Sequence, residues 1–496
     1  MKCLVLVLYV LIWGLGGAKR LHRGRRTGGN LIPPTTEDRM MVFQDQYFEQ
    51  VLDHSDPTNR ATWKQDWTFV GSLAQLNSQR YYLNDNFFNK SKRNVAFLMV
   101  GGEAEISSKW MYQGAWIKSA KEHGAICFQL EHRFYGTSQP FQDLSTEHLK
   151  LLTSQQALDD LATFIVAMNK RYELLDVKWI TFGGSYSGSL AAWLRMKYSH
   201  LVHGAVSSSA PLYAKVDFEE YFLVVAKDLS TVYSEECASV VKTALSLLEE
   251  KVLEGNDTLG ETFNLCDTKV NTNVGNDVSN LFSLMTDSFA YAAQYNNDNR
   301  NGEFNINYVC DIMTNSSFGN VLDRLAYLNA DADCIDYSFE SMIRELRNET
   351  LDSGVSEGAR QWTYQTCTEF AFYQTTNGLP QIFTNRIPLQ FYIDICSETF
   401  GAEINHTYLN RITERTNVIY GAYDIQVSNV VFVHGTLDPW YPLGLIGSNE
   451  EGMTTVLING TAHCANMYDE KEDDSKDLKE ARDVVQKLIR TWINEL

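Results

Sequence analysis

Two patterns of apolar and polar positions alternate along the chain. Short apolar runs bounded by turn residues predict buried strands, and apolar positions that recur every three or four residues predict helices. Over the first 215 residues these strands and helices alternate, which is typical of a parallel sheet covered by helices on both faces. The predicted strands are 62–70, 78–84, 94–100, 125–132, 179–182 and 204–210, and the predicted helices are 111–123, 154–171 and the stretch after the turn at 183–188.

The pattern of alternating strands and helices stops near Leu212 and resumes after residue 415. Residues 216–415 combine helical periodicity with asparagine-rich loops and six cysteines between 237 and 396. Strands then resume at 429–434 and 454–458, and an amphipathic helix with an apolar stripe from Leu478 to Trp492 ends the chain. Because the sheet pattern resumes, we expect an α/β domain built from 41–215 and 416–496 that is interrupted by an inserted, mostly helical domain.

The stretch from Trp179 to Tyr198 joins a short apolar strand to a helix through a sharp turn with a serine at its tip. Glycines at 183 and 184 permit close approaches that a side chain would obstruct. The helix N-terminus beneath the serine favours developing negative charge. This is the setting of an α/β-hydrolase nucleophile and predicts that Ser185 is the nucleophile. The usual motif is Gly-x-Ser-x-Gly, and here Ser187 occupies the place of the second glycine.

A serine nucleophile needs a base that accepts its proton and an acid that orients the base. In α/β-hydrolases they follow in the order Ser, Asp or Glu, His, each on a loop after a strand. Asp438 follows the strand 429–434 in the loop HGTLDPW, and His463 follows the strand 454–458. The order and setting therefore predict a catalytic triad of Ser185, Asp438 and His463. The other downstream histidines do not fit this setting: His200, His203, His406 and His434.

Backbone N–H groups should stabilise the oxyanion of the reaction. The first is expected from Tyr186, the residue after the nucleophile, and the second from Gly101 and Gly102, which directly follow the strand 94–100. A plain glycine turn is the alternative interpretation of that loop. The neighbouring Glu103 could bind a substrate amino terminus or brace the loop.

Net charge and the N-terminal segments bear on the partners and the processing of the protein. The 496 residues carry a formal net charge of −20, spread along the chain, which argues against nucleic acid as a partner. Residues 1–18 combine Lys2, an apolar run and small residues and predict a signal peptide; for the alternative, a membrane anchor, the run is short. Residues 19–40 are basic and predict a flexible linker or a short propeptide trimmed at basic pairs.

Cysteines and sequons indicate the secretory pathway, either secreted or lysosomal. No Cys/His spacing suggests zinc, so we expect no metal and no cofactor. Once Cys3 leaves with the signal peptide, the candidate disulfide partners are Cys127, Cys237, Cys266, Cys310, Cys334, Cys367, Cys396 and Cys464. Candidate glycosylation sites, not all of them expected to carry glycans, are Asn89, Asn256, Asn315, Asn348, Asn405 and Asn459.

Several motifs, in order from about residue 45 to the C-terminus, resemble the serine peptidases typified by prolyl carboxypeptidase. That group also contains dipeptidyl peptidase II and the thymus-specific serine protease. The stretch QWTYQTCTEFAFY and the residue at 187 are most similar to the thymus-specific serine protease branch. The motifs are EHRFYG (131–136), GGSYSG (183–188), AAWLRMKY (191–198), SSSAP (207–211), QTCTEF (365–370), LDPW (437–440) and Ala462-His463.

The resemblance implies an α/β-hydrolase sheet with a helical, disulfide-stapled cap over the cleft, and the same triad. It implies a homodimer as a family-level expectation. Ser189 stands where prolyl carboxypeptidase-like members carry a bulky apolar residue that lines the proline pocket, and Trp440 offers an aromatic wall, so both are predicted substrate contacts. The cap disulfides implied are Cys237–Cys310, Cys266–Cys334 and Cys367–Cys396, which leaves Cys127 and Cys464 either paired or free.

These patterns predict a secreted or lysosomal serine exopeptidase that acts on short peptides, of the carboxypeptidase or dipeptidyl-peptidase type, with cleavage after proline as one expectation. An esterase or lipase on the same triad is an alternative, although the cap lacks an obvious exposed apolar helix for lipid. A catalytically silent binding protein of the same fold is another alternative, and the intact triad argues against it.

Overall fold

The structure is a computed structural model. The predicted signal peptide, most of the segment 19–40 and most of the predicted strand 62–70 lie outside the residues that it describes. The described residues are 31–34, 43–56, 58, 61–62, 78–256, 258–267, 270–272, 274–297, 304–330, 333–351, 358–378, 382–447 and 452–494.

The strands of the main sheet lie in the order β1-β2-β4-β3-β5-β6-β9-β10 among the described residues. From β4 to β10 all neighbours run parallel, as predicted, whereas the edge strands β1 and β2 pair antiparallel. The predicted parallel sheet is therefore confirmed except at this edge. The strands are β1 Gln46–Phe48, β2 Gln79–Asn84, β3 Val95–Val100, β4 Ile126–Leu130, β5 Lys178–Gly184, β6 Val202–Ser208, β9 Val430–Gly435 and β10 Met453–Ile458.

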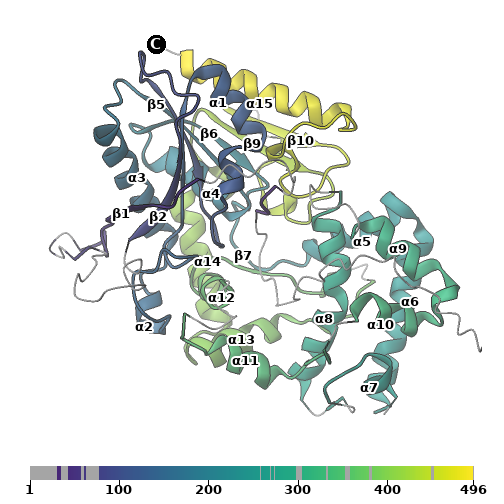
Figure 1. Cartoon of the computed structure of the whole chain (residues 1–496). Coiled ribbons are helices and arrows are strands. Elements are labelled where there is room, and N and C mark those ends of the chain that lie inside the picture. Colours follow the sequence, from purple (N-terminus) through teal and green to yellow (C-terminus); the bar gives the residue numbers. More distant parts are fainter. Residues whose placement is uncertain are drawn as a thin grey trace, which may run out of the picture.

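Alternate side chains of β3 enter two different apolar cores, one on each face of the sheet. Ala96, Leu98 and Val100 pack in the core that contains α3 and α4, and Phe97 and Met99 pack in the core that contains α1 and α15. This explains why β3 is apolar at every position. The covering helices are α1 Ala115–His123, α3 Ser154–Arg171, α4 Tyr186–Lys197 and α15 Lys476–Asn494 (Figure 1).

The helix α3 has the predicted bounds, but α1 does not. The prediction of one helix over 111–123 was wrong at its start, because Gly114 lies at φ 98° and separates α1 from a 3₁₀ turn, η1, at Ser108–Met111. Gly114 adopts a positive φ between these two pieces, which only glycine does readily.

A mostly helical part lies between β6 and β9 in the sequence and beside the sheet in space (Figure 1). It contains a two-stranded parallel sheet of β7 Lys215–Asp217 and β8 Ala371–Tyr373. The predicted domain boundaries at 215/216 and 415/416 stay predictions. The helices are α5 Glu220–Asp228, α6 Glu235–Leu253, α7 Leu259–Thr262, α8 Gly275–Gln294, α9 Ile306–Thr314, α10 Val321–Asn329, α11 Phe339–Leu346, α12 Ala359–Gln365, α13 Leu389–Phe400 and α14 His406–Tyr420, with α2 Thr146–Leu149 before them.

Three disulfides cross-link this helical part, and their pairs are those that the family resemblance implied. Cys237 in α6 pairs with Cys310 in α9, which closes a loop of 73 residues, and Cys266 pairs with Cys334. A third bridge links Cys367, in the π-helical turn η5 Thr366–Phe370, to α13 through Cys396. Such cross-links restrict the unfolded chain and stabilise the cap. Cys127 and Cys464 are both unpaired and buried.

The asparagines of the six sequons are accessible to different degrees, and glycosylation stays a prediction. Their side chains are exposed at Asn89, Asn315, Asn405 and Asn459 and half-buried at Asn256 and Asn348. No helix among the described residues is both long and apolar enough to span a membrane.

Asp228, at the end of α5, is a buried acid that makes the stability of the protein depend on pH. It is fully buried and neither of its carboxylate oxygens has a hydrogen-bond partner within the described chain. Burial raises the pKa of Asp228 to about 8, and the charge of Asp438 adds to this effect. The folded state therefore holds a proton that the unfolded chain releases above pH 4, and stability falls as the pH rises from about 4 to about 8.

We expect Asp228→Asn to raise the free energy of unfolding at pH 8 by more than about 1 kcal/mol and to change it little at pH 4. Urea unfolding across this pH range measures the difference, with the exposed Asp483→Asn in α15 as the control. A difference that does not grow with pH would contradict the assignment of Asp228 as a buried neutral acid.

Candidate active site

Ser185 lies between the end of β5 and the start of α4, at φ 62° and ψ −136°. This backbone conformation is strained for a residue with a side chain and is frequent at catalytic sites. The Ser185 N–H donates to the Ser208 carbonyl at 2.9 Å, which holds the turn against β6. Only 2% of Ser185 is exposed. The local structure is therefore the strand–turn–helix arrangement that the sequence predicted.

The turn is tight because the two glycines before the serine have no side chains. A Cβ on Gly183 would overlap the backbone of Ser187 and Gly188 in the first turn of α4. A Cβ on Gly184 would lie 2.6 Å from the Met467 Sδ. A side chain at Gly183 would therefore collide with backbone, whereas one at Gly184 would displace the side chains packed there.

Ser187, the residue that departs from the usual motif, has a structural role in this turn. Its hydroxyl donates to the Gly184 carbonyl at 2.8 Å and accepts from the Gly184 N–H at 3.0 Å. Both groups are buried. The side chain at 187 thus closes the turn by hydrogen bonding.

The predicted acid and base are in contact. The Nδ1 of His463 and the Oδ1 of Asp438 are 2.8 Å apart, and both side chains are fully buried. The Trp440 N–H donates to the same carboxylate oxygen at 3.0 Å, which fixes the Asp438 rotamer. Burial alone lowers the pKa of His463, but the Asp438 charge and the Cys464 side chain outweigh it and raise the pKa well above its ordinary value. An imidazole in this setting holds a proton strongly once it has accepted one.

Residues that the sequence analysis did not single out seat the histidine loop beside the nucleophile. The Asn466 amide donates to the Ser208 hydroxyl at 2.8 Å, and the Cys464 N–H donates to the Ser209 hydroxyl at 2.8 Å. Ser208 is also the residue whose carbonyl holds the Ser185 N–H. The SSSAP motif therefore joins the serine turn to the histidine loop, and its polar residues between two apolar elements were the available signal.

The cap reaches the same loops through Gln294, the last residue of α8. Its carbonyl accepts from the His463 N–H at 3.0 Å, and its side-chain oxygen accepts from the Trp440 indole at 3.0 Å and the Tyr221 hydroxyl at 2.8 Å. The ring of the next residue, Tyr295, lies edge-on to His463 with centroids 6.2 Å apart. A hollow of about 60 Å³ in the cap is lined by Tyr221, Gln294 and Tyr295 together with other cap residues. The catalytic loops therefore contact the cap directly.

The glycine loop after β3 lies against the serine turn. A Cβ on Gly102 would be 3.2 Å from the Ser187 Cβ. The Gly101 N–H donates to the Leu130 carbonyl at 2.9 Å and is therefore already engaged, which leaves Gly102 as the better candidate for an oxyanion donor. Tyr186 is the first residue of α4, so its N–H has no partner within the helix.

Glu103 is buried beside this loop, and its Oε1 has no hydrogen-bond partner within the described chain. Burial raises the pKa of Glu103 to about 8, against smaller opposing effects of its own N–H and of His463. The electrostatic interaction with His463 places this carboxyl near the predicted base. A buried, unpartnered acid in such a position can accept a cationic group or donate a hydrogen bond while protonated.

The two other predicted substrate contacts differ in their surroundings. The Ser189 hydroxyl is fully buried in α4 and donates to the Pro211 carbonyl at 2.8 Å, so it is used inside the protein. Trp440 packs against aromatic rings of the cap, among them Phe218 and Phe372. Contacts of either residue with substrate stay predictions.

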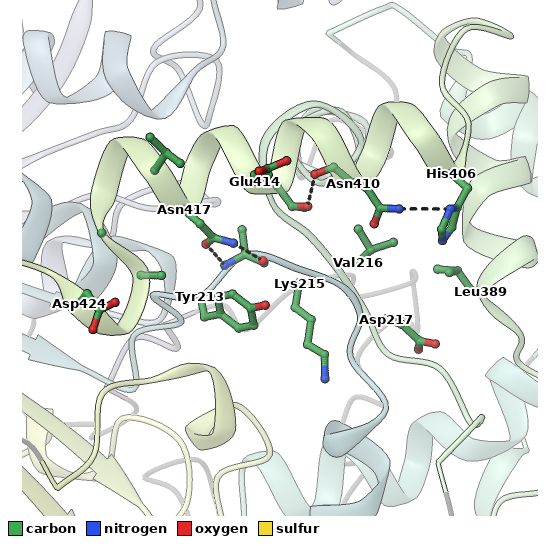
Figure 2. A pocket seen from close by; sticks show the side chains of 15 residues that line it. Tyr213, Lys215, Val216, Asp217, Leu389, His406, Asn410, Glu414, Asn417 and Asp424 are labelled. Carbon is green, nitrogen blue, oxygen red and sulfur yellow. Dashed lines mark hydrogen bonds between the residues drawn. The ribbon is translucent and has the colours of Figure 1, made fainter.

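A second hollow lies away from these residues, beside α14 (Figure 2). Its volume is about 640 Å³, and it shares no lining residue with the predicted triad or its loops. Asn417 bridges the Ala214 backbone in this hollow, accepting from its N–H and donating to its carbonyl, both at 2.8 Å. Within the described residues, no group of three or more His, Cys, Asp or Glu side chains is placed to hold a metal.

Comparison with known proteins shows the family of the chain. A family model described as serine carboxypeptidase S28 matches residues 50–485. The chain belongs to this family. The resemblance to serine peptidases of the prolyl carboxypeptidase type, drawn from the motifs, is therefore confirmed, and with it the serine peptidase class and the α/β-hydrolase fold.

Relatives of this S28 peptidase cover nearly its whole length. It is 31% identical to the thymus-specific serine protease of Mus musculus, over 92% of this chain and 88% of that protein. It is 26% identical to the lysosomal Pro-X carboxypeptidase of Homo sapiens, over 96% of this chain and 94% of that protein. Among solved structures, it is similar to a proline iminopeptidase of Mycobacterium smegmatis, with 12% identity, a TM-score of 0.35 and coverage of 84% of this chain and 96% of that chain.

The role of Ser187 in the S28 peptidase is testable. We expect Ser187→Ala to lower the free energy of unfolding by about 1 to 2 kcal/mol, because it removes a hydroxyl that serves both buried backbone groups of Gly184. Denaturant unfolding measures this, with the exposed Ser239→Ala in α6 as the control. Equal stability of Ser187→Ala and the wild type would show that the turn does not need the hydroxyl.

Proposed function

We propose that the protein is a serine exopeptidase in which Ser185, Asp438 and His463 form the catalytic triad. The observation that carries the proposal is the buried contact between Asp438 and His463. The loop of His463 is also hydrogen-bonded to Ser208, whose carbonyl accepts from the N–H of the strained Ser185. In this mechanism Ser185 attacks the scissile carbonyl while His463 accepts its proton, and His463 then passes the proton to the leaving amine. Water then attacks the carbonyl of the acyl-enzyme while His463 accepts a proton from it, and His463 passes that proton to the Ser185 oxygen as the ester bond breaks.

Charge development in this mechanism matches the electrostatics of the site. Asp438 stabilises the imidazolium that forms on His463, in agreement with the raised pKa of that histidine. The N–H groups of Tyr186 and Gly102 stabilise the oxyanion, since neither has a hydrogen-bond partner within the described chain and their loops are in contact. The positive end of α4 adds to this effect.

A free amino terminus is the substrate group that the site favours. The Oε1 of Glu103 has no hydrogen-bond partner among the described residues, and the charge of this carboxyl interacts with His463. The buried arginines Arg80 and Arg133 are already paired with carboxylates. An ammonium group would give the ionised form of Glu103 a cationic partner, whereas a terminal carboxylate would meet like charge once Glu103 is ionised. The proposal is therefore removal of short pieces from the amino terminus.

Cleavage after proline is the proposed preference within this class. A relative named as a Pro-X carboxypeptidase covers nearly the whole chain, which supports it. The aromatic cluster of Phe218, Tyr221, Phe372 and Trp440 beside Asp438 also supports it, because a proline ring packs well on flat aromatic surfaces.

The proposed site of action is the secretory pathway, with the signal peptide removed and some sequons glycosylated. The three disulfides support this, because such bonds persist in oxidising compartments. Relatives named as lysosomal support an acidic compartment within it. A homodimer stays a prediction.

A fluorophosphonate probe tests the triad. We expect the mature protein to be labelled between pH 4.5 and 7.5, and Ser185→Ala to lose labelling completely because the nucleophile is absent. Thermal unfolding of Ser185→Ala serves as the control for folding. Digestion of a peptide library identifies the shortened end. Hydrolysis of simple esters without any peptide cleavage would favour the esterase alternative, and labelling that persists in Ser185→Ala would refute the proposed nucleophile.

Glu103→Gln tests recognition of the amino terminus. We expect kcat/KM to fall at least about tenfold on peptides with a free amino terminus and to change little on N-acetylated peptides. In the wild type, kcat/KM on free peptides should rise with pH up to about 8, because an ammonium group binds the ionised form of Glu103. Glu103→Gln should lose the part of this rise that free peptides show beyond N-acetylated peptides in the wild type, as steady-state kinetics can measure. Equal losses on free and acetylated peptides would instead indicate that Glu103 braces the loop.

A further inference from the structure

The residue before the proposed nucleophile forms a small socket on the face of the sheet opposite α4. Gly184 is buried at the end of β5 and has no side chain to fill the space beside its Cα. A Cβ at that position would be 2.6 Å from the Met467 Sδ, 2.8 Å from the Cys464 Sγ and 2.9 Å from the Leu31 Cδ1. Three side chains from two distant parts of the chain therefore meet at this glycine.

Two of the three side chains belong to the loop of the proposed base. Cys464 directly follows His463 and lies at φ 59°, in the left-handed region that a residue with a side chain rarely adopts. Met467 lies three residues further on and is buried. Because this loop carries His463, any shift of Cys464 or Met467 away from Gly184 also moves the imidazole relative to Ser185.

The third side chain comes from a segment far outside the loop and the sheet. Ile32 and Pro34 are buried, and Leu31 packs against the same apolar core as Cys464 and Met467. The Tyr468 hydroxyl donates to the Ile32 carbonyl at 3.0 Å, and the Tyr468 ring stacks on Trp110. The residues 31–34 are thus anchored directly to the histidine loop, although the sequence places them in a basic linker or propeptide.

We propose that Leu31 is a positioning residue that holds the His463 loop against Gly184. This inference rests on the proposed triad. Leu31 closes the open side of the socket, and the hydrogen bond from Tyr468 to Ile32 keeps it in place. Misplacement of a base by about 1 Å can lower a rate about a hundredfold, so a small loss of packing here has a large catalytic effect. Proteolytic cleavage after Arg26 would keep Leu31 and its contact with Gly184, whereas loss of residues 31–34 would remove that contact.

Point variants of the full chain test this role. We expect Leu31→Ala to lower kcat at least about tenfold with KM changed less than about twofold, to slow fluorophosphonate labelling equally, and to shift the acidic limb of the pH–rate profile. Leu31→Met, which still reaches the socket, should retain most of the activity. Tyr468→Phe removes only the hydroxyl that anchors Ile32 and should give an intermediate loss, which provides a readout if Leu31→Ala does not fold.

Leu478→Ala in α15 is the matched control, because it removes an equally apolar side chain from the same core without touching Gly184. It should lower the thermal midpoint with kcat and the pH–rate profile unchanged. Unchanged kcat and pH profile in both Leu31→Ala and Tyr468→Phe, or an equal loss of kcat in Leu478→Ala, would overturn the positioning role. Absence of labelling in the wild type would instead refute the proposed triad itself.

Discussion

The arrangement of the site depends on the close passage of α4 over the end of β5. The helix lies directly on the strand because Gly183 has no side chain, and the histidine loop lies directly on the other face because Gly184 has none. Ser185 sits between these contacts in a strained conformation, held by the hydrogen bond from its N–H to Ser208. Strain of this kind persists only where the surrounding structure over-determines it.

Support for the loops after β9 and β10 comes from two sides. From the sheet, Ser208 and Ser209 hold the histidine loop through hydrogen bonds to its backbone and to Asn466. From the cap, Gln294 holds the His463 backbone and the Trp440 indole at once. A change in the position of α8 is therefore transmitted directly to the acid and the base. This contact gives the cap a structural role in the site in addition to covering it.

The elements closest to the site were predictable from local patterns, and the contacts between them were not. Periodicity identified α3 because it has a regular apolar face, and an unbroken apolar run identified β3. The order of loops after strands identified Asp438 and His463 as neighbours. The predicted start of α1 was wrong because a single glycine at positive φ interrupts an apolar pattern. Gln294 was missed because its partner His463 lies far away in the sequence and an isolated glutamine carries no signal.

Three acidic side chains, in the site and around it, make the stability of the folded protein depend on pH. Burial raises the pKa of Glu103 and Asp228 to about 8 and that of Glu369 to about 7, although Ser154 donates to Glu369 from the start of α3. Each group holds a proton in the folded state over a pH range in which the unfolded chain has released it, so each lowers stability as the pH rises through that range. The contribution of these three acids to stability is therefore most favourable at acidic pH, where all three are neutral. A cationic substrate group at the proposed site would favour the ionised form of Glu103, whose charge interacts with His463.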